Sequence, residues 1–144
     1  MASTRHADAD LQFEVPADWI NRSVIVWSAP ATAAEVPPNF VIAYDRPRAD
    51  EDLGAYVTRQ IADLGRSAQQ FRLELRREIT FAGRPAVEVV FEWLAPPGVM
   101  RQRQIFTLLP GGRVTSVAST ATATDFAAAD ETFGGILKSF RWSA

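Results

Sequence analysis

The stretch FRLELRREITFAGRPAVEVVFEWLAPPGVMRQRQIFTLLPGGRVTSVAST, residues 71–120, decides the fold. It contains four runs rich in β-branched and aromatic residues, at 71–81, 86–94, 99–109 and 114–120, separated by short segments with glycine or proline. Such residues favour strands, and connections this short join antiparallel neighbours. The stretch therefore predicts an antiparallel meander of four strands.

Three further strands are predicted in the N-terminal third. The run Leu11–Val15 alternates polar and apolar residues and stops at Pro16, and similar β-rich runs cover 23–27 and 39–44. The segment Ala29–Pro38 lies between the last two and ends in a pair of prolines, which disfavours a helix. We expect a loop there.

Two segments have the pattern of amphipathic helices. Asp50, Glu51 and Asp52 place negative charge where a helix N-terminus favours it, and apolar residues then recur at helical spacing until Gly65. A second helix is expected after Thr124 as N-cap, with Phe126 to Phe140 as its apolar side. The whole chain, 1–144, is predicted to form a single α+β domain with an antiparallel sheet of about six or seven strands and two helices.

The composition excludes several classes of function. The formal net charge is −2 and no cluster of lysine and arginine is present, so nucleic-acid binding is not expected. There is no cysteine, which removes disulfides and thiolate metal sites. No apolar run approaches the roughly 20 residues that span a bilayer, and the N-terminus lacks the pattern of a signal peptide. We expect a cytoplasmic protein without stable membrane association.

The ionisable residues do not form a recognisable catalytic site. His6 is the only histidine and lies in a terminus expected to be mobile. Glu88 and Glu92 share one strand parity, as do Glu74 and Glu78, which is typical of surface ion pairs with arginines on neighbouring strands. There is no nucleophile elbow, phosphate-binding loop or metal-ligand cluster. We therefore predict a protein that is not an enzyme and uses neither cofactor nor metal.

Some strands are apolar on both parities. Val24 and Val26 point to one side of their strand, while Ile25 and Trp27 point to the other. A strand that is apolar on both sides is usually covered on both sides. Either a helix lies on each face of the sheet, or part of one face is left open for another chain.

Three glutamines lie in apolar surroundings. Gln60 falls inside the apolar stripe of the first helix, and Gln102 and Gln104 share strand parity with Met100 and Phe106. A buried amide must find hydrogen-bond partners or it destabilises the protein. Either these amides pair with each other and the backbone, or they are available to hydrogen-bond a ligand in an apolar groove.

Several short segments, in this order, resemble the DcrB-like family, whose fold is similar to PsbP. They are Phe13–Trp19, Arg22–Trp27, Asn39–Ile42, Tyr56–Gln60, Gly83–Ala86, Arg103–Phe106 and the closing helix up to Ser139–Phe140. Without an export signal, the chain resembles the cytoplasmic members, the effector-associated (Eag) chaperones of type VI secretion. Two features depart from the family pattern: the two prolines in the loop Ala29–Pro38, and Ala68 in place of a larger apolar residue.

The resemblance implies a homodimer that binds the apolar N-terminal transmembrane helices of a secreted effector. It implies that a concave groove shields these helices from water. Transferred to this sequence, the groove residues are Val24, Val26, Val41, Gln60, Leu64 and Gln104. The alternative is a binding module or assembly factor for a small apolar ligand or another protein.

Overall fold

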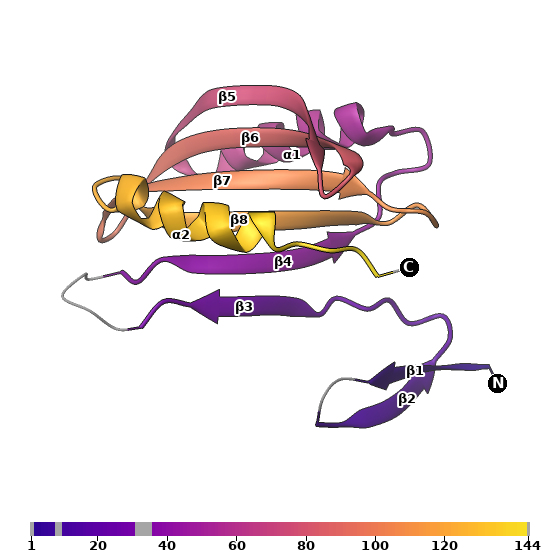
Figure 1. Ribbon diagram of the computed structural model, residues 1–144. Coiled ribbons are helices and arrows are strands. Elements are labelled where there is room, and N and C mark those ends of the chain that lie inside the picture. Colours follow the sequence, from indigo (N-terminus) through magenta and orange to yellow (C-terminus); the bar gives the residue numbers. More distant parts are fainter. Residues whose placement is uncertain (1, 8–9, 31–35, 144) are drawn as a thin grey trace.

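The computed structural model describes residues 2–7, 10–30 and 36–143, which form eight strands and two helices (Figure 1). In chain order they are β1 (Ser3–Ala7), β2 (Gln12–Pro16), β3 (Val24–Ser28), β4 (Asn39–Asp45), α1 (Leu53–Ser67), β5 (Gln69–Phe81), β6 (Arg84–Ala95), β7 (Gly98–Leu108), β8 (Val114–Thr122) and α2 (Phe126–Lys138).

Six strands form one antiparallel sheet in the order β3-β4-β8-β7-β6-β5. The meander predicted from residues 71–120 is confirmed as β5 to β8, and β4 and β3 extend it beyond β8. The β5–β6 turn consists of Ala82 and Gly83, both with positive φ, which suits a two-residue hairpin and favours glycine. The predicted α+β class with an antiparallel sheet and two helices is confirmed.

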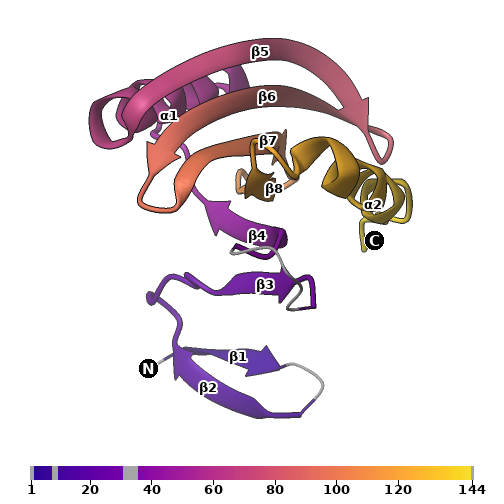
Figure 2. The same cartoon turned by 90° about the vertical axis from the view of Figure 1, so that its left-hand side faces the viewer.

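The two helices lie on opposite faces of this sheet, as the view in Figure 2 shows. On one face Tyr56 and Val57 of α1 pack with Val89, Phe91 and neighbouring residues of β6 and β7. On the other face, Phe126 and Phe133 of α2 form a second core with apolar residues of β4 to β8: Phe40, Phe81, Ala86, Ile105, Val117 and Ala121. A helix therefore covers part of each face, as one of the two sequence interpretations required.

The N-terminal strands β1 and β2 pair only with each other and form a separate hairpin beyond β3 (Figure 1). The sequence predicted no strand around His6, but the structure has one there. His6 belongs to β1, faces Phe13 across the hairpin, and stacks on its ring with centroids 4.8 Å apart. This pairing was not apparent from the sequence because β1 contains no apolar alternation.

Each helix has one boundary that differs from the expected one: the end of α1 and the start of α2. Asp52 caps α1 by accepting a hydrogen bond from the amide of Ala55, but the helix continues through Gly65 to Ser67. Gly65 is tolerated because a single glycine costs a helix only about 1 kcal/mol. The N-cap of α2 is Asp125 and not Thr124. Of the expected loop Ala29–Pro38, residues 31–35 lie outside the described residues.

The charged residues on the α2 side form ion pairs across β5, β6 and β7. Glu88 pairs with Arg77 at 2.7 Å and with Arg103 at 3.3 Å, while Glu92 and Glu74 both pair with Arg72 and Arg101. Burial opposes ionisation of Glu92, but the hydrogen bonds from the two arginines outweigh it and lower its pKa. The expected pairs therefore exist for Glu74, Glu88 and Glu92, although Glu88 is buried rather than solvated. Glu78 makes no ion pair among the described residues. It lies opposite Val87 on the α1 side, because a register shift between Leu73 and Leu75 places it on the other face from Glu74.

Candidate binding face beside helix α1

The strand register places most of the predicted groove residues on one face of the sheet. Val26 of β3 lies opposite Val41 of β4, Val41 opposite Ala118 of β8, and Ala118 opposite Gln104 of β7. Directly opposed residues point to the same side of a sheet. Val24 belongs to the same side, since it lies two residues from Val26. This is also the side of α1, because Phe106 and Val89 on it pack against the helix.

A hydrogen bond attaches the beginning of α1 to the end of β4. The Tyr56 hydroxyl donates to Asp45 Oδ2 at 2.8 Å, and the Arg59 guanidinium stacks on the Tyr56 ring. Arg59 is held in turn by two hydrogen bonds to the Glu51 carboxylate, at 2.6 and 2.8 Å. Burial and the hydrogen bond to Asp45 raise the pKa of Tyr56, so its hydroxyl keeps its proton and remains a donor.

The direction of Gln60 follows from this attachment. Residues four apart in a helix lie on the same side, so Tyr56, Gln60 and Leu64 form one row. This row faces β4, because Tyr56 donates a hydrogen bond to Asp45 at the end of that strand. The row containing Gly54 and Thr58 faces β5 instead, where Arg76 donates to the Gly54 carbonyl at 2.9 Å and to the Thr58 hydroxyl at 2.8 Å.

We call the surface between this helix row and β3 the open face. It consists of the six predicted residues and the strand residues that lie in register between them: Val24, Val26, Asn39, Val41, Gln60, Leu64, Gln102, Gln104, Ser116, Ala118 and Thr120. Val24 and Val26 are 52% and 57% exposed, and Val41, Gln60, Leu64 and Gln104 are half-buried. The two valines of β3 therefore present apolar surface to solvent.

The amides of the open face are only partly paired. Thr120 Oγ1 donates to Gln102 Oε1 at 3.0 Å, and Gln102 Nε2 donates to Gln104 Oε1 at 3.2 Å. The side-chain nitrogen of Gln104 is left without an acceptor within the described ranges. The Gln60 amide likewise makes no hydrogen bond to any described residue. Gln102 and Gln104 therefore satisfy each other in part, whereas Gln60 stays available to a ligand.

The sequence did not single out Asn39 and Thr120, which also face this side. Asn39 lies opposite Thr120, and its Oδ1 is buried without a hydrogen-bond donor among the residues that the structure describes. Such an atom destabilises the protein until a donor reaches it. Only the register of β4 with β8 reveals this position, since Asn39 begins its strand and has the appearance of a turn residue in the sequence.

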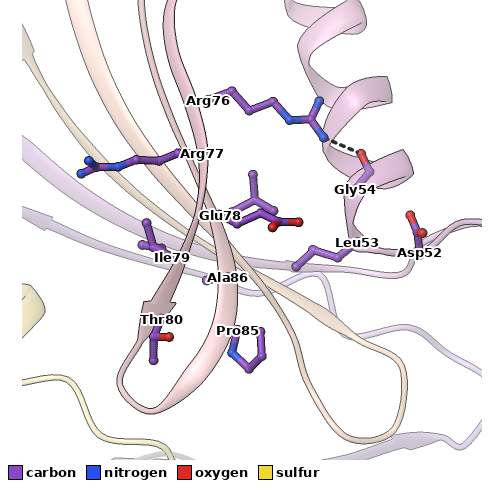
Figure 3. Close-up of a pocket in the computed structure, with 11 residues that line it drawn as sticks. Asp52, Leu53, Gly54, Arg76, Arg77, Glu78, Ile79, Thr80, Pro85 and Ala86 are labelled. Carbon is purple, nitrogen blue, oxygen red and sulfur yellow. Dashed lines mark hydrogen bonds between the residues drawn. The ribbon is translucent and has the colours of Figure 1, made fainter.

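A cavity elsewhere on the molecule contains none of the predicted residues. It measures about 970 Å³ and opens between the start of α1 and the β5–β6 hairpin (Figure 3). Arg76 crosses its wall to the Gly54 carbonyl, and Glu78 points into it from β5. The described residues contain no group of three or more potential metal ligands.

The chain is thus an antiparallel sheet with one helix on each face and an apolar surface beside α1. The chain belongs to the DcrB family, whose model matches residues 10–139. The family resemblance indicated by the sequence is thereby confirmed. No helix within the described ranges is long and apolar enough to cross a membrane.

One known protein is similar in sequence to this chain, and another is similar in structure. The chain is 28% identical over 121 residues to the protein named Effector EagT6 of Pseudomonas aeruginosa, and the match covers 83% of each chain. A Pseudomonas aeruginosa protein of unknown function, described as a putative regulator, superimposes with a TM-score of 0.85 at 22% identity, over 99% of this chain and 98% of that chain.

A more distant structure confirms the PsbP-like fold. Cyanobacterial PsbP from Synechocystis superimposes with a TM-score of 0.56 at 13% identity, over 98% of this chain and 92% of that chain. At this identity the similarity concerns the fold alone.

Proposed function

We propose that this protein is a cytoplasmic chaperone that binds the apolar N-terminal transmembrane helices of a type VI secretion effector. The chaperone shields these helices from water and catalyses no reaction. The observation that carries the proposal is the open face, where exposed valines of β3 share one side of the molecule with the amides of Gln60 and Gln104, whose hydrogen-bonding groups are not all paired among the described residues. The similarity to Effector EagT6 supports a partner that is a secreted effector.

The width of the open face suits one helix. Three strand spacings separate Val26 on β3 from Gln104 on β7, which corresponds to about 14 Å. An α-helix with its side chains is about 10–12 Å across. A single helix can therefore lie between α1 and β3 with apolar contacts on both sides. Each apolar Å² removed from water contributes roughly 25 cal/mol.

The polar groups of the open face suit a membrane helix in particular. Transmembrane helices carry Gly, Ser and Thr at the positions where they pack against each other. Hydroxyl groups at these positions can accept hydrogen bonds from the side-chain nitrogens of Gln60 and Gln104. These interactions replace those that a neighbouring membrane helix would make. A purely apolar surface would bind such a helix without recognising its packing side.

The length of the open face supports a homodimer. β4 has seven residues and extends about 20 Å, whereas a membrane-spanning helix of about 20 residues is about 30 Å long. One copy therefore leaves about a third of such a helix uncovered. A second copy supplies the missing apolar surface.

The test is retention of the partner by groove variants. Tagged protein is purified from cells that express the neighbouring genes, and the proteins retained with it are identified by mass spectrometry. We expect a large protein with apolar N-terminal segments, lost in Gln60→Ala and in Val26→Asp. Both side chains are partly exposed or unpaired, so the circular dichroism spectrum and melting temperature should stay close to those of the parent.

Two controls separate the open face from the rest of the surface. Val99→Asp changes a valine that is 44% exposed on the opposite side of the sheet, and Gln69→Ala changes an exposed glutamine at the start of β5. Both should retain the partner. If Gln60→Ala and Val26→Asp retain it as tightly as the parent does, the open face is not the binding site. Retention of a small apolar ligand without any protein would favour the alternative binding module.

A further inference from the structure

Three arginines from distant parts of the chain line one pocket. Arg84 begins β6, Arg113 precedes β8, and Arg141 belongs to the segment that follows α2 (Figure 1). The pocket measures about 500 Å³ and lies between residues 140–143 and the strands β4 and β8. We call it the C-terminal pocket. Its volume falls within the range of small-molecule sites, about 300–1,000 Å³.

The arginines of the C-terminal pocket have no carboxylate partner. Elsewhere on the sheet Arg77, Arg101 and Arg103 pair with glutamates. By contrast, the pocket arginines form no ion pair with any described residue, and no described residue of the pocket wall is acidic. Cations gathered without a counter-charge repel each other. A bound anion would relieve this repulsion.

Aromatic rings hold two of the guanidinium groups in place. The guanidinium carbon of Arg113 lies 4.3 Å from the centroid of the Tyr44 ring, and that of Arg84 lies 5.3 Å from Trp142. The Trp142 ring packs edge-on against Phe140, with centroids 5.2 Å apart. A stacked guanidinium uses its face and leaves the N–H groups at its edge free, and these groups fit carboxylate or phosphate oxygens. The arginines are therefore preorganised for an anion, and the rings provide an apolar wall beside it.

The pocket wall also contains an unused hydroxyl group. Thr115 is 2% exposed, and its Oγ1 has no hydrogen-bond partner among the described residues. Thr115 points to the same side of the sheet as Tyr44, which lies opposite it on β4. Because the hydroxyl has no hydrogen bond to break, rotation about χ1 can turn it toward an anion in the pocket.

We propose that the C-terminal pocket binds a small aromatic anion, a carboxylate or a phosphate ester. Its charged group lies between the arginines, and its ring packs on the aromatic wall. The ligand connects β6, β8 and residues 140–143. The pocket lies on the α2 side of the sheet, because Tyr44 is two residues from Ile42, which packs in the α2 core. The open face lies on the α1 side, so the anion and a bound helix do not compete.

The first experiment is a titration with phenyl phosphate. The full chain is labelled for NMR spectroscopy, and the indole N–H signal of Trp142, assigned with Trp142→Phe, is followed at neutral pH and constant ionic strength. We expect a saturable shift with a Kd of about 4 mM or lower, the value that ordinary ligand efficiency gives for a molecule of this size. Benzoate is titrated in the same way, and the tighter of the two anions assigns the phosphate or the carboxylate class.

Two further probes separate the charge from the ring. Inorganic phosphate lacks the ring and benzyl alcohol lacks the charge, so each should bind at least about tenfold more weakly than phenyl phosphate. No saturable shift with either aromatic anion would overturn the proposal. Benzyl alcohol that binds as tightly as phenyl phosphate would overturn the role of the arginines, and inorganic phosphate that does so would overturn an aromatic ligand.

Substitutions locate the site. Arg84→Gln and Arg113→Gln should each weaken the binding of phenyl phosphate at least about tenfold, since each removes a charge-assisted hydrogen bond. Arg66→Gln is the matched control, because this arginine of α1 is 71% exposed and lies outside the pocket wall, and it should bind as the parent does. Parental affinity in both pocket variants would overturn the proposal, provided that circular dichroism shows them folded.

Thr115→Val tests the hydroxyl without changing the charge of the pocket. The variant should bind phenyl phosphate about threefold more weakly and should melt no lower than the parent, because the lost hydroxyl had no partner. Parental affinity together with a lower melting temperature would overturn the part assigned to Thr115. Partner retention by Gln60→Ala is measured on the other face of the sheet, so the two proposals fail independently.

Discussion

The Tyr56 hydroxyl donates a hydrogen bond to Asp45 Oδ2 at 2.8 Å and thereby attaches the first turn of α1 to the end of β4. Tyr56 is almost completely buried, and its ring packs edge-on against Phe106. Gln60 follows one helical turn later. This single contact between two elements that are adjacent in sequence therefore determines which side of the helix faces the open part of the sheet.

Tyr56→Phe should weaken this attachment and keep the packing of the ring. A hydrogen bond to a charged group contributes roughly 1.5–3 kcal/mol, and Asp45 is partly exposed and can be solvated, so we expect a loss of about 1.5 kcal/mol in the free energy of unfolding. Denaturation by urea measures it. Tyr44→Phe is the matched control, because the Tyr44 hydroxyl makes no hydrogen bond within the described ranges, and should change the free energy by less than about 0.5 kcal/mol.

Gln104→Leu should reduce partner binding more than stability. The variant removes the acceptor of Gln102 Nε2, but both side chains are half-buried and water can reach the freed amide. One lost hydrogen bond to the partner, about 0.5–1.5 kcal/mol, corresponds to a roughly 2- to 12-fold weaker affinity for a synthetic membrane helix. Titration in detergent-free buffer measures it. Equal affinity in parent and variant would exclude Gln104 from the contact.

Glu88→Ala should destabilise the protein by about 2 kcal/mol. Its side chain is 8% exposed and pairs with both Arg77 and Arg103, so the substitution leaves two guanidinium groups without this acceptor. Arg103 keeps its bond to Asp130 and Arg77 is largely exposed, which limits the loss. Glu78→Ala, on an exposed carboxylate without an ion pair among the described residues, should change stability by less than about 0.5 kcal/mol. Thermal unfolding of the three proteins gives the comparison.

Glu51 should make stability depend on pH in the acid range. Hydrogen bonds from the Arg59 side chain and from the Arg48 amide lower its pKa from 4.5 to about 2. Because the folded-state pKa is below the unfolded-state value, the stabilisation is fully present above pH 4.5 and disappears as the pH falls toward 2. The difference in melting temperature between parent and Glu51→Gln should shrink over this window. Glu131→Gln, on an exposed residue of α2, should show no such trend.

Local patterns predicted most of the secondary structure. The runs around Phe91 and Val117 are rich in β-branched and aromatic residues and lie between short turn segments with glycine or proline, which favours strands, and Asp52 before Leu53 marks the start of a helix. Gly65 misled the prediction of the helix end, because the packing of α1 on the sheet outweighs the weak propensity of one glycine. The strand containing His6 was missed, because its partner in β2 stabilises it and not its own composition.

The candidate site was also predictable only in part from the sequence. The apolar character of Val24 and Val26 and the unusual position of Gln60 follow from spacing alone. Their arrangement on one face does not follow from spacing, because it depends on the pairing of β4 with β8, in which Val41 lies opposite Ala118, far along the chain. The buried Asn39 Oδ1 and the C-terminal pocket are equally invisible in the sequence. Side-chain periodicity is a local property and is therefore encoded locally, whereas register and burial depend on contacts between distant segments and are decided only when the whole sheet has formed.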